Sequence, residues 1–142
     1  EALTDRRPAN WDTDQDGMPD WWEKLAGTNP SAADNNELTD GEYTQLERYL
    51  NWLAEPHFIT SAGNKLTIDL KQYFAGYNQQ PVFTLESSIQ PQEGKMKLNK
   101  KGILTISLNK KAADCLIDIK VKATDKDQVA SLQRTFHIAI TQ

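Results

Sequence analysis

Residues 115–123 read Cys-Leu-Ile-Asp-Ile-Lys-Val-Lys-Ala, and this stretch decides the fold of the larger part of the chain. Apolar residues take every second position from Cys115 to Ala123, with Asp118 and two lysines between them. Because side chains alternate between the two faces of a strand, this period predicts a β-strand with one face in a core and the other in water. The thiol of Cys115 is expected on the apolar face, as a core residue and not a reactive group.

The same alternation recurs on both sides of this strand, and turn signals such as Gly63-Asn64 and Lys101-Gly102 separate the stretches. The other alternating or β-rich stretches are residues 66–70, 81–85, 104–108 and 136–140. Short strands at this spacing predict a mainly β fold, with roughly six or seven strands in an antiparallel β-sandwich. The sequence predicts no helix within it.

The first part of the chain has a different composition. Residues 1–55 carry 13 acidic and 4 basic side chains, a net charge of −9, whereas residues 56–142 carry 7 acidic and 12 basic ones, a net charge of +5. All four tryptophans lie in the first part, at Trp11, Trp21, Trp22 and Trp52. Two compositions in one chain of 142 residues predict two domains, residues 1–55 and residues 56–142.

The first domain is expected to contain two short helices. One runs from about Pro19 to Ala26, with proline in its first turn and Gly27 as its stop. The other covers roughly residues 41–54, and Thr39 and Glu42 at its start have the spacing of a capping box. Its apolar stripe consists of Leu46, Tyr49, Leu50 and Leu53. Helices this small must dock on something else to bury their apolar faces.

An acidic loop carries the strongest functional signal, since residues 12–23 read Asp-Thr-Asp-Gln-Asp-Gly-Met-Pro-Asp-Trp-Trp-Glu. This spacing matches the twelve-residue loop of an EF-hand, in which carboxylates converge on one calcium ion and a glycine permits the sharp turn. The predicted ligands are the carboxylates of Asp12, Asp14, Asp16, Asp20 and Glu23 and the backbone carbonyl of Met18. Five carboxylates this close repel one another without a cation, so we expect a calcium-binding loop and not a solvated acidic turn.

The calcium loop is expected to have a structural role. Residues 5–10 before it show no helical pattern, so the paired helices that open in calcium sensors are missing. A second segment, Asn36–Glu47, has a related spacing, but Leu38 stands at its third position, where an oxygen ligand is needed. Helix capping by Thr39 and Glu42 explains the same residues without a metal, so a second ion at this segment stays open.

The motifs around the loop resemble the tail of a known enzyme family. Trp-Trp-Glu-Lys follows at 21–24, Gly-Thr-Asn-Pro at 27–30, and Asp-Gly-Glu-Tyr-Thr-Gln-Leu-Glu-Arg-Tyr-Leu-Asn at 40–51. The loop is similar to those of dockerin and thrombospondin-type repeats. The whole segment is similar to the one that follows the catalytic domain in secreted bacterial pectate lyases and related polysaccharide lyases. In that family an acidic loop more often precedes the second motif, which is eroded here.

Residues from about Phe58 to Thr141 resemble the cadherin-like and immunoglobulin-like repeats of bacterial surface enzymes. The matching features are Leu-Lys-Gln-Tyr-Phe at 70–74, the strand at 81–85, Gly-Ile-Leu-Thr-Ile at 102–106, Val-Lys-Ala-Thr-Asp at 121–125 and Phe-His-Ile at 136–138. This resemblance implies an immunoglobulin-like or cadherin-like sandwich and carries little information about function.

Together the two resemblances imply a non-catalytic, calcium-stabilised accessory or linker region of a secreted bacterial carbohydrate-active enzyme of the pectate lyase type. The chain begins at Glu1 without a leader, so we expect a piece of a longer polypeptide whose upstream catalytic domain is its partner. The expected location is secreted, periplasmic or on the bacterial cell surface. The alternatives are a carbohydrate-binding module for anionic polysaccharide and a cell-surface adhesion repeat.

No catalytic site is predicted in this chain. A calcium-dependent lyase needs a basic residue beside an ion that the substrate can reach, whereas the predicted loop surrounds its ion with protein oxygens. His57 and His137 lie far apart in the sequence. His137 is expected to point outward from a strand that buries Phe136 and Ile138.

Lysines gather around one expected hairpin, where the candidate glycan-binding residues are Lys95, Lys97, Lys100 and Lys101. A basic patch can hold an anionic polysaccharide, but the favoured interpretation is a solvated edge that prevents strand-to-strand aggregation. For Trp21 and Trp22 the alternatives are sugar stacking and a local core, and the core is favoured. An acidic chain predicts no nucleic-acid partner, and no apolar run approaches the roughly 18 residues of a membrane span.

Overall fold

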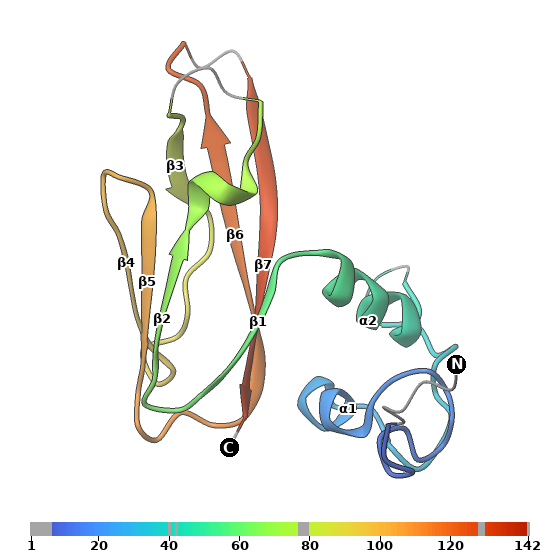
Figure 1. Cartoon of the computed structure of the whole chain (residues 1–142). Helices are drawn as coiled ribbons and strands as arrows, with labels where there is room; N and C mark the ends of the chain where they lie inside the picture. The colour runs from blue at the N-terminus through green and yellow to red at the C-terminus, as the bar shows by residue number, and fades with distance from the viewer. Residues whose placement is uncertain (1–6, 40, 42, 77–79, 128–129, 142) are drawn as a thin grey trace, which may run out of the picture. The chain divides into compact units, whose positions relative to one another are not determined.

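The computed structural model describes residues 7–39, 41, 43–76, 80–127 and 130–141. The chain divides into two compact units, Glu1–Ala54 and Glu55–Gln142, and each is described by itself. This division lies one residue before the boundary that the change in composition predicts. Figure 1 traces helices in the first unit and strands in the second.

In its described residues the second unit forms two β-sheets (Figure 1). The larger sheet has the order β1-β7-β6-β3 and consists of β1 (His57–Ser61), β7 (Ser131–Thr141), β6 (Cys115–Thr124) and β3 (Val82–Leu85). The smaller sheet has the order β2-β5-β4 and consists of β2 (Lys65–Asp69), β5 (Ile103–Leu108) and β4 (Gly94–Leu98). Neighbouring strands are antiparallel, except that β1 runs parallel to β7.

The apolar core of the second unit is built from residues of both sheets. Its fully or almost fully buried members include Ile68, Leu104 and Ile106 from the smaller sheet and Ile119, Val121, Phe136 and Ile138 from the larger one. Inward and outward positions alternate along β5 and β6, as the pleat of a strand requires. The predicted fold class, mainly β with an antiparallel immunoglobulin-like sandwich, is confirmed.

The predicted strands are found with local differences. β6 covers the stretch at 115–123, and Cys115 packs against the core, where burial raises the pKa of its thiol. β2 stops at Asp69, and Leu70–Tyr73 forms a short 3-10 helix, so the prediction of no helix in this unit is wrong. The carboxylate of Asp69 accepts the N–H of Lys71 at 3.3 Å, which favours this turn over a continued strand.

Two α-helices form in the described part of the first unit. α1 (Asp20–Ala26) begins one residue later than predicted, with the extended Pro19 as its N-cap, and stops before Gly27 as predicted. Gly27 has a φ of 87°, and in this left-handed conformation its N–H donates to the carbonyl of Glu23 at 2.8 Å. Among the described residues, neither helix combines the length and the apolar surface that crossing a bilayer requires.

The second helix, α2 (Gln45–Ala54), begins four residues later than the sequence predicts. The segment before it folds back on itself as a short antiparallel turn. The hydroxyl of Thr44 accepts the N–H of Glu47 at 3.1 Å, so Thr44 caps the helix in place of Thr39. Glu42, the partner of Thr39 in the predicted capping box, lies outside the described residues.

Aromatic side chains form much of the core of the first unit. Trp22 is fully buried on α1 and meets Tyr49 of α2 edge to face, with 5.1 Å between the ring centroids. Trp21 meets Trp52 of α2 in the same manner at 5.8 Å. Edge-to-face pairs of this kind stabilise a core beyond the area they bury. The adjacent tryptophans therefore pack in the local core.

The buried face of α2 differs from the predicted apolar stripe. Leu50 and Leu53, two members of that stripe, are exposed, whereas Trp52 is buried beside Tyr49. The prediction is wrong here because these two large rings pack against the tryptophans of α1, which turns the leucines outward.

Candidate metal centre

The loop at residues 12–23 turns around the carboxylate of Asp12. One oxygen of Asp12 accepts the N–H of Asp16 at 3.2 Å, and the other accepts the N–H of Gly17 at 2.9 Å. Gly17 has a φ of 98°, a conformation that glycine adopts at less cost than residues with a Cβ. The N–H of Asp20 donates to the carbonyl of Trp11 at 2.8 Å. These bonds bring the ends of the loop together and bend the acidic segment into a compact turn.

Two groups of carboxylates lie close enough to hold a single cation. One contains Asp12, Asp14 and Asp16, and the other contains Asp16, Glu23 and Asp34. In each group, one carboxylate oxygen from every residue lies within 4.8 Å of the others. Calcium binds oxygen at about 2.3–2.6 Å, so two ligands of one ion stand at most about 5.2 Å apart. Both groups meet this limit, and Asp16 links them.

Four of these carboxylates share one hydrogen-bonding pattern, in which the chain engages only one oxygen. The engaged oxygens of Asp14, Asp16, Glu23 and Asp34 accept bonds at 3.2, 3.0, 3.2 and 2.9 Å. Their donors, in the same order, are the N–H of Asp16, the N–H of Met18, the hydroxyl of Thr28 and the N–H of Asn29. Within the described residues the four other oxygens are buried without a partner: Asp14 Oδ2, Asp16 Oδ2, Glu23 Oε2 and Asp34 Oδ1. Buried acceptors without a donor are costly, and a cation satisfies several of them at once.

Burial and mutual repulsion disfavour the charged form of these groups. Glu23 is fully buried, and burial, followed by the charge of Asp16, raises its pKa to about 7. The pKa of Asp14 is raised as well, first by burial and then by the charges of Asp16 and Asp12, against a hydrogen bond from the N–H of Asp16. A bound cation reverses this balance, because its charge favours ionised carboxylates.

The predicted ligand Asp20 is engaged elsewhere. Its Oδ1 accepts the N–H of Thr13 at 2.8 Å, and its Oδ2 accepts the hydroxyl of Thr13 at 2.5 Å. These two bonds lower the pKa of Asp20, and the residue belongs to neither carboxylate group. Asp20 thus joins the two ends of the loop. Met18, the predicted carbonyl ligand, is fully buried, and its N–H holds Asp16 in place.

Asp34 is the member of the site that sequence reasoning missed. It lies eleven residues after Glu23, in the segment between the two helices, and outside the twelve-residue motif. Its only local signal is the acidic side chain itself, which is common in loops without any metal. The turn that follows α1 brings it to Glu23 and Asp16, and spacing along the chain does not reveal that turn.

The second candidate loop, Asn36–Glu47, shows no comparable arrangement in its described residues. Leu38, which stands where a ligand is needed, is 68% exposed and pairs with Thr44 across the turn. None of the described carboxylates of this segment belongs to either acidic group. Asp40 lies outside the described residues, so a second ion stays a prediction.

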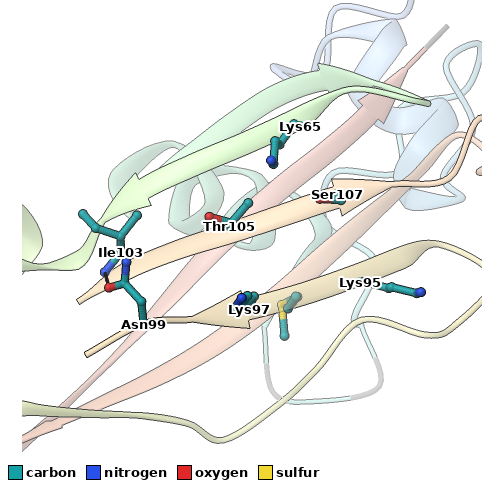
Figure 2. A pocket seen from close by; sticks show the side chains of 8 residues that line it. Lys65, Lys95, Lys97, Asn99, Ile103, Thr105 and Ser107 are labelled. Carbon is teal, nitrogen blue, oxygen red and sulfur yellow. Dashed lines mark hydrogen bonds between the residues drawn. The ribbon is translucent and has the colours of Figure 1, made fainter. Parts of the chain in front are cut away.

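Lysines from two strands line a shallow depression on the smaller sheet of the sandwich. Figure 2 shows Lys65 on β2, Thr105 and Ser107 on β5, and Lys95 and Lys97 on β4. Lys65 and Lys95 are both register partners of Ser107, and Lys97 is a partner of Thr105. Within the described residues none of the three lysines forms an ion pair. The depression therefore offers positive charge beside hydroxyl groups.

Only part of the predicted lysine set meets in this depression. Lys100 and Lys101 lie in the turn between β4 and β5 and do not line it. The carbonyl of Lys100 accepts a bond of 2.9 Å from the side chain of Gln80. Lys65 lines the depression as well, because β2 and β4 both pair with β5. The sequence pattern does not predict this strand order.

His137 lies on the face of β7 away from the core, as predicted, but it is buried there and not exposed. Its Nδ1 lies 2.6 Å from the carboxylate of Asp118, and its Nε2 lies 3.4 Å from that of Glu55. Burial lowers the pKa of His137, but the hydrogen bond and charge of Asp118, together with those of Glu55, outweigh it and raise the pKa. The side chain of Glu55 covers the outer face of β7 here, and the N–H of His137 holds the neighbouring chain in place by donating to the carbonyl of Pro56 at 2.9 Å.

Comparisons with known proteins add little. No family profile matches the sequence, and no curated protein matches it. Among solved structures, the crystal structure of the titin M3 domain matches 62% of this chain and 90% of the titin chain, with 12% identity and a TM-score of 0.38. A likeness this low carries no argument about function, so the interpretation rests on the site itself.

Proposed function

We propose that the first unit binds one calcium ion at the loop of residues 12–23, and that the ion stabilises this unit and takes no part in a reaction. The supporting observation is the set of buried carboxylate oxygens that have no hydrogen-bond partner within the described chain. The loop ligands are Asp12, Asp14, Asp16, Glu23 and the carbonyl of Met18. Calcium takes six to eight hard oxygen ligands, which this set approaches. Of the predicted ligands, Asp20 has the least support, because Thr13 engages both of its oxygens.

Isothermal titration calorimetry of the whole chain with calcium tests this proposal. We expect one ion per chain, and we expect the double change Asp12→Asn with Glu23→Gln to abolish the binding. A matched control is Glu37→Gln, which removes an exposed carboxylate from the same unit. If the unaltered chain takes up no calcium, the proposal is overturned.

We also propose that the chain is a non-catalytic accessory region of a secreted bacterial polysaccharide lyase of the pectate type, joined to an upstream catalytic domain. The motifs at residues 12–30 and 40–51 support this proposal. The purified chain should then release no unsaturated oligogalacturonides from polygalacturonate. The coding sequence upstream of Glu1 decides the question of the parent, because a full-length polypeptide without a lyase-like domain contradicts it.

A second candidate function is binding of an anionic polysaccharide at the lysine-lined depression. The favouring observation is that Lys65, Lys95 and Lys97 converge from two strands around Thr105 and Ser107, without carboxylate partners in the described residues. Ammonium groups attract the carboxylates of uronic acids, and the hydroxyl groups can bond sugar hydroxyls.

Retention on polygalacturonate tests this second function. Exposed charges are screened as salt rises, to a Debye length of about 3 Å at 1 M, so only close and simultaneous contacts survive at about 0.5 M salt. The change of Lys65, Lys95 and Lys97 to glutamine should abolish retention, while Lys110 and Lys111, which do not line the depression, serve as the control pair. Equal losses from both sets indicate unspecific attraction and exclude a site.

A further inference from the structure

Asp34 approaches the site from a part of the chain that the loop motif does not contain. One of its carboxylate oxygens lies within 4.8 Å of an oxygen from Asp16 and from Glu23. Asp34 Oδ1 is buried and has no hydrogen-bond partner in the described residues. This is the same pattern that the loop carboxylates show.

We propose that Asp34 is a direct ligand of the same cation, so that two segments of the chain build the site: the loop at 12–23 and the turn at 29–35. This inference rests on the proposed function, since it assumes a hard divalent cation at the loop. It adds a carboxylate that the EF-hand spacing does not include, and it makes cation binding depend on how the chain turns back after α1.

The two carboxylates grouped with Asp34 belong to deeply buried side chains. Glu23 has no exposed surface and Asp16 is 8% exposed, yet each has one oxygen without a partner among the described residues. One carboxylate oxygen of Asp34 lies within 4.8 Å of an oxygen of each of these two side chains. Three like charges in such a place are unfavourable unless a positive charge lies between them. The convergence therefore points to a cation and differs from an ordinary acidic surface cluster.

The chain holds Asp34 in a defined orientation. Its Oδ2 accepts the N–H of Asn29 at 2.9 Å, and its backbone carbonyl accepts the N–H of Glu37 at 2.9 Å. The turn thus fixes one oxygen, while the other, Oδ1, is buried without a hydrogen-bond partner in the described residues. A ligand that is ordered before binding loses less conformational freedom when the ion arrives, which favours affinity.

The proposed ligand also connects the ion to α2. The carbonyl of Asn35, the residue after Asp34, accepts the N–H of Leu46 in the first turn of α2 at 3.1 Å. Glu23 lies on α1, so an ion held by Glu23 and Asp34 links α1 to the segment that leads into α2. The cation then stabilises the packing of the two helices and not the loop alone.

Calcium affinity of three single variants tests the assignment. Asp34→Asn should raise the calcium Kd by about tenfold or more, since affinity depends on the number of charged ligands. Glu37→Gln removes the same charge from the same segment and should change the Kd by less than about twofold, because exposed charges are screened. Asp20→Asn should have a smaller effect than Asp34→Asn, which is the opposite of what the EF-hand spacing predicts.

Europium luminescence separates a ligand from a distant charge. Lifetimes in light and heavy water count the water molecules on a bound lanthanide, which replaces calcium at oxygen sites. Asp34→Ala should add about one water to the count, because a lost ligand is replaced by solvent. Glu37→Ala should leave it unchanged. A structural role of Asp34 outside the metal shell does not change this number.

The results distinguish the inference from the proposed function. If the unaltered chain binds no calcium, both fail. If it binds calcium but Asp34→Asn keeps the affinity and Asp34→Ala keeps the water count, only the role of Asp34 is overturned. If Asp34→Asn does not fold, hydrogen exchange of the unaltered chain decides: calcium should slow exchange at Asn29 and Glu37, and unchanged rates contradict the inference.

Discussion

The sandwich and the first unit bury different kinds of side chain. Between its sheets the sandwich buries a continuous apolar cluster that includes Ile119, Val121 and Phe136, with no exposed surface on any of the three. The first unit buries aromatic rings but also Glu23 and Asp16, whose unpaired oxygens oppose folding. Apolar burial stabilises by about 1.5–3 kcal/mol per large side chain, whereas buried charge without a partner costs free energy. The comparison predicts that removal of the metal leaves the stability of the sandwich unchanged and strongly lowers that of the first unit.

Spectroscopy can follow the two units separately. All four tryptophans lie in the first unit, so tryptophan fluorescence reports its unfolding alone. Circular dichroism of the β-sheet reports mainly the second unit, which contains the strands.

The largest effect is expected from Phe136→Ala in the sandwich. Phe136 is fully buried, and its ring meets Tyr73 at 5.2 Å and Phe74 at 6.3 Å. The cavity should lower the free energy of unfolding of the sandwich by about 3–5 kcal/mol. Urea unfolding followed by circular dichroism measures it. The calcium affinity of the first unit should stay unchanged. A loss of affinity would contradict independent folding of the two units.

Chelation of calcium should have the next largest effect, confined to the first unit. An ion that binds only the folded state stabilises it by about 2.7 kcal/mol at a hundredfold excess over its Kd. Hydrogen exchange with and without chelator should show lost protection in α1 and unchanged protection in β6. If protection from Trp21 to Leu25 stays the same, the ion does not stabilise this unit.

Glu23→Gln should change stability in opposite directions with and without calcium. The variant keeps the shape of the side chain but removes a buried charge. In chelator, it should raise the free energy of unfolding of the first unit by about 1–2 kcal/mol, because an unpaired buried carboxylate is lost. In calcium it should lower that free energy, because a ligand is lost. Urea unfolding followed by tryptophan fluorescence measures the free energy of unfolding in both conditions. If the variant changes it in the same direction with and without calcium, the result argues against a cation site.

The smallest effect concerns His137 and the pH dependence of the sandwich. Asp118 and Glu55 raise the pKa of this buried histidine despite its burial. Stability from the protonated ring is therefore fully present below the unfolded pKa of about 6.5 and is lost as pH rises through the higher folded pKa. Asp118→Asn should flatten this dependence, measured by thermal unfolding against pH. If the sandwich instead becomes more stable as pH rises through this window, the predicted direction of the pH dependence is wrong.

The strands of the sandwich and the acidic loop could be predicted because both depend on short-range spacing. The period of two from Cys115 to Ala123 reports a strand at any place in a sheet, and β6 appears there. The twelve-residue motif likewise brings Asp12, Asp14 and Asp16 together through local turns. Local rules failed for Leu50 and Leu53, because aromatic packing between helices decides which face of α2 is buried.

The sequence by itself determined that the chain has an acidic unit followed by a β-sandwich, and that an acidic loop precedes α1. Only the tertiary structure decided which side chains meet. Asp34 reaches Glu23, Lys65 reaches the depression beside Lys95, and His137 is covered by Glu55. The physical reason is the same in each case: charges and ligands act over a few ångströms in space, and the turns and sheet pairings that bring distant residues that close leave no period in the sequence.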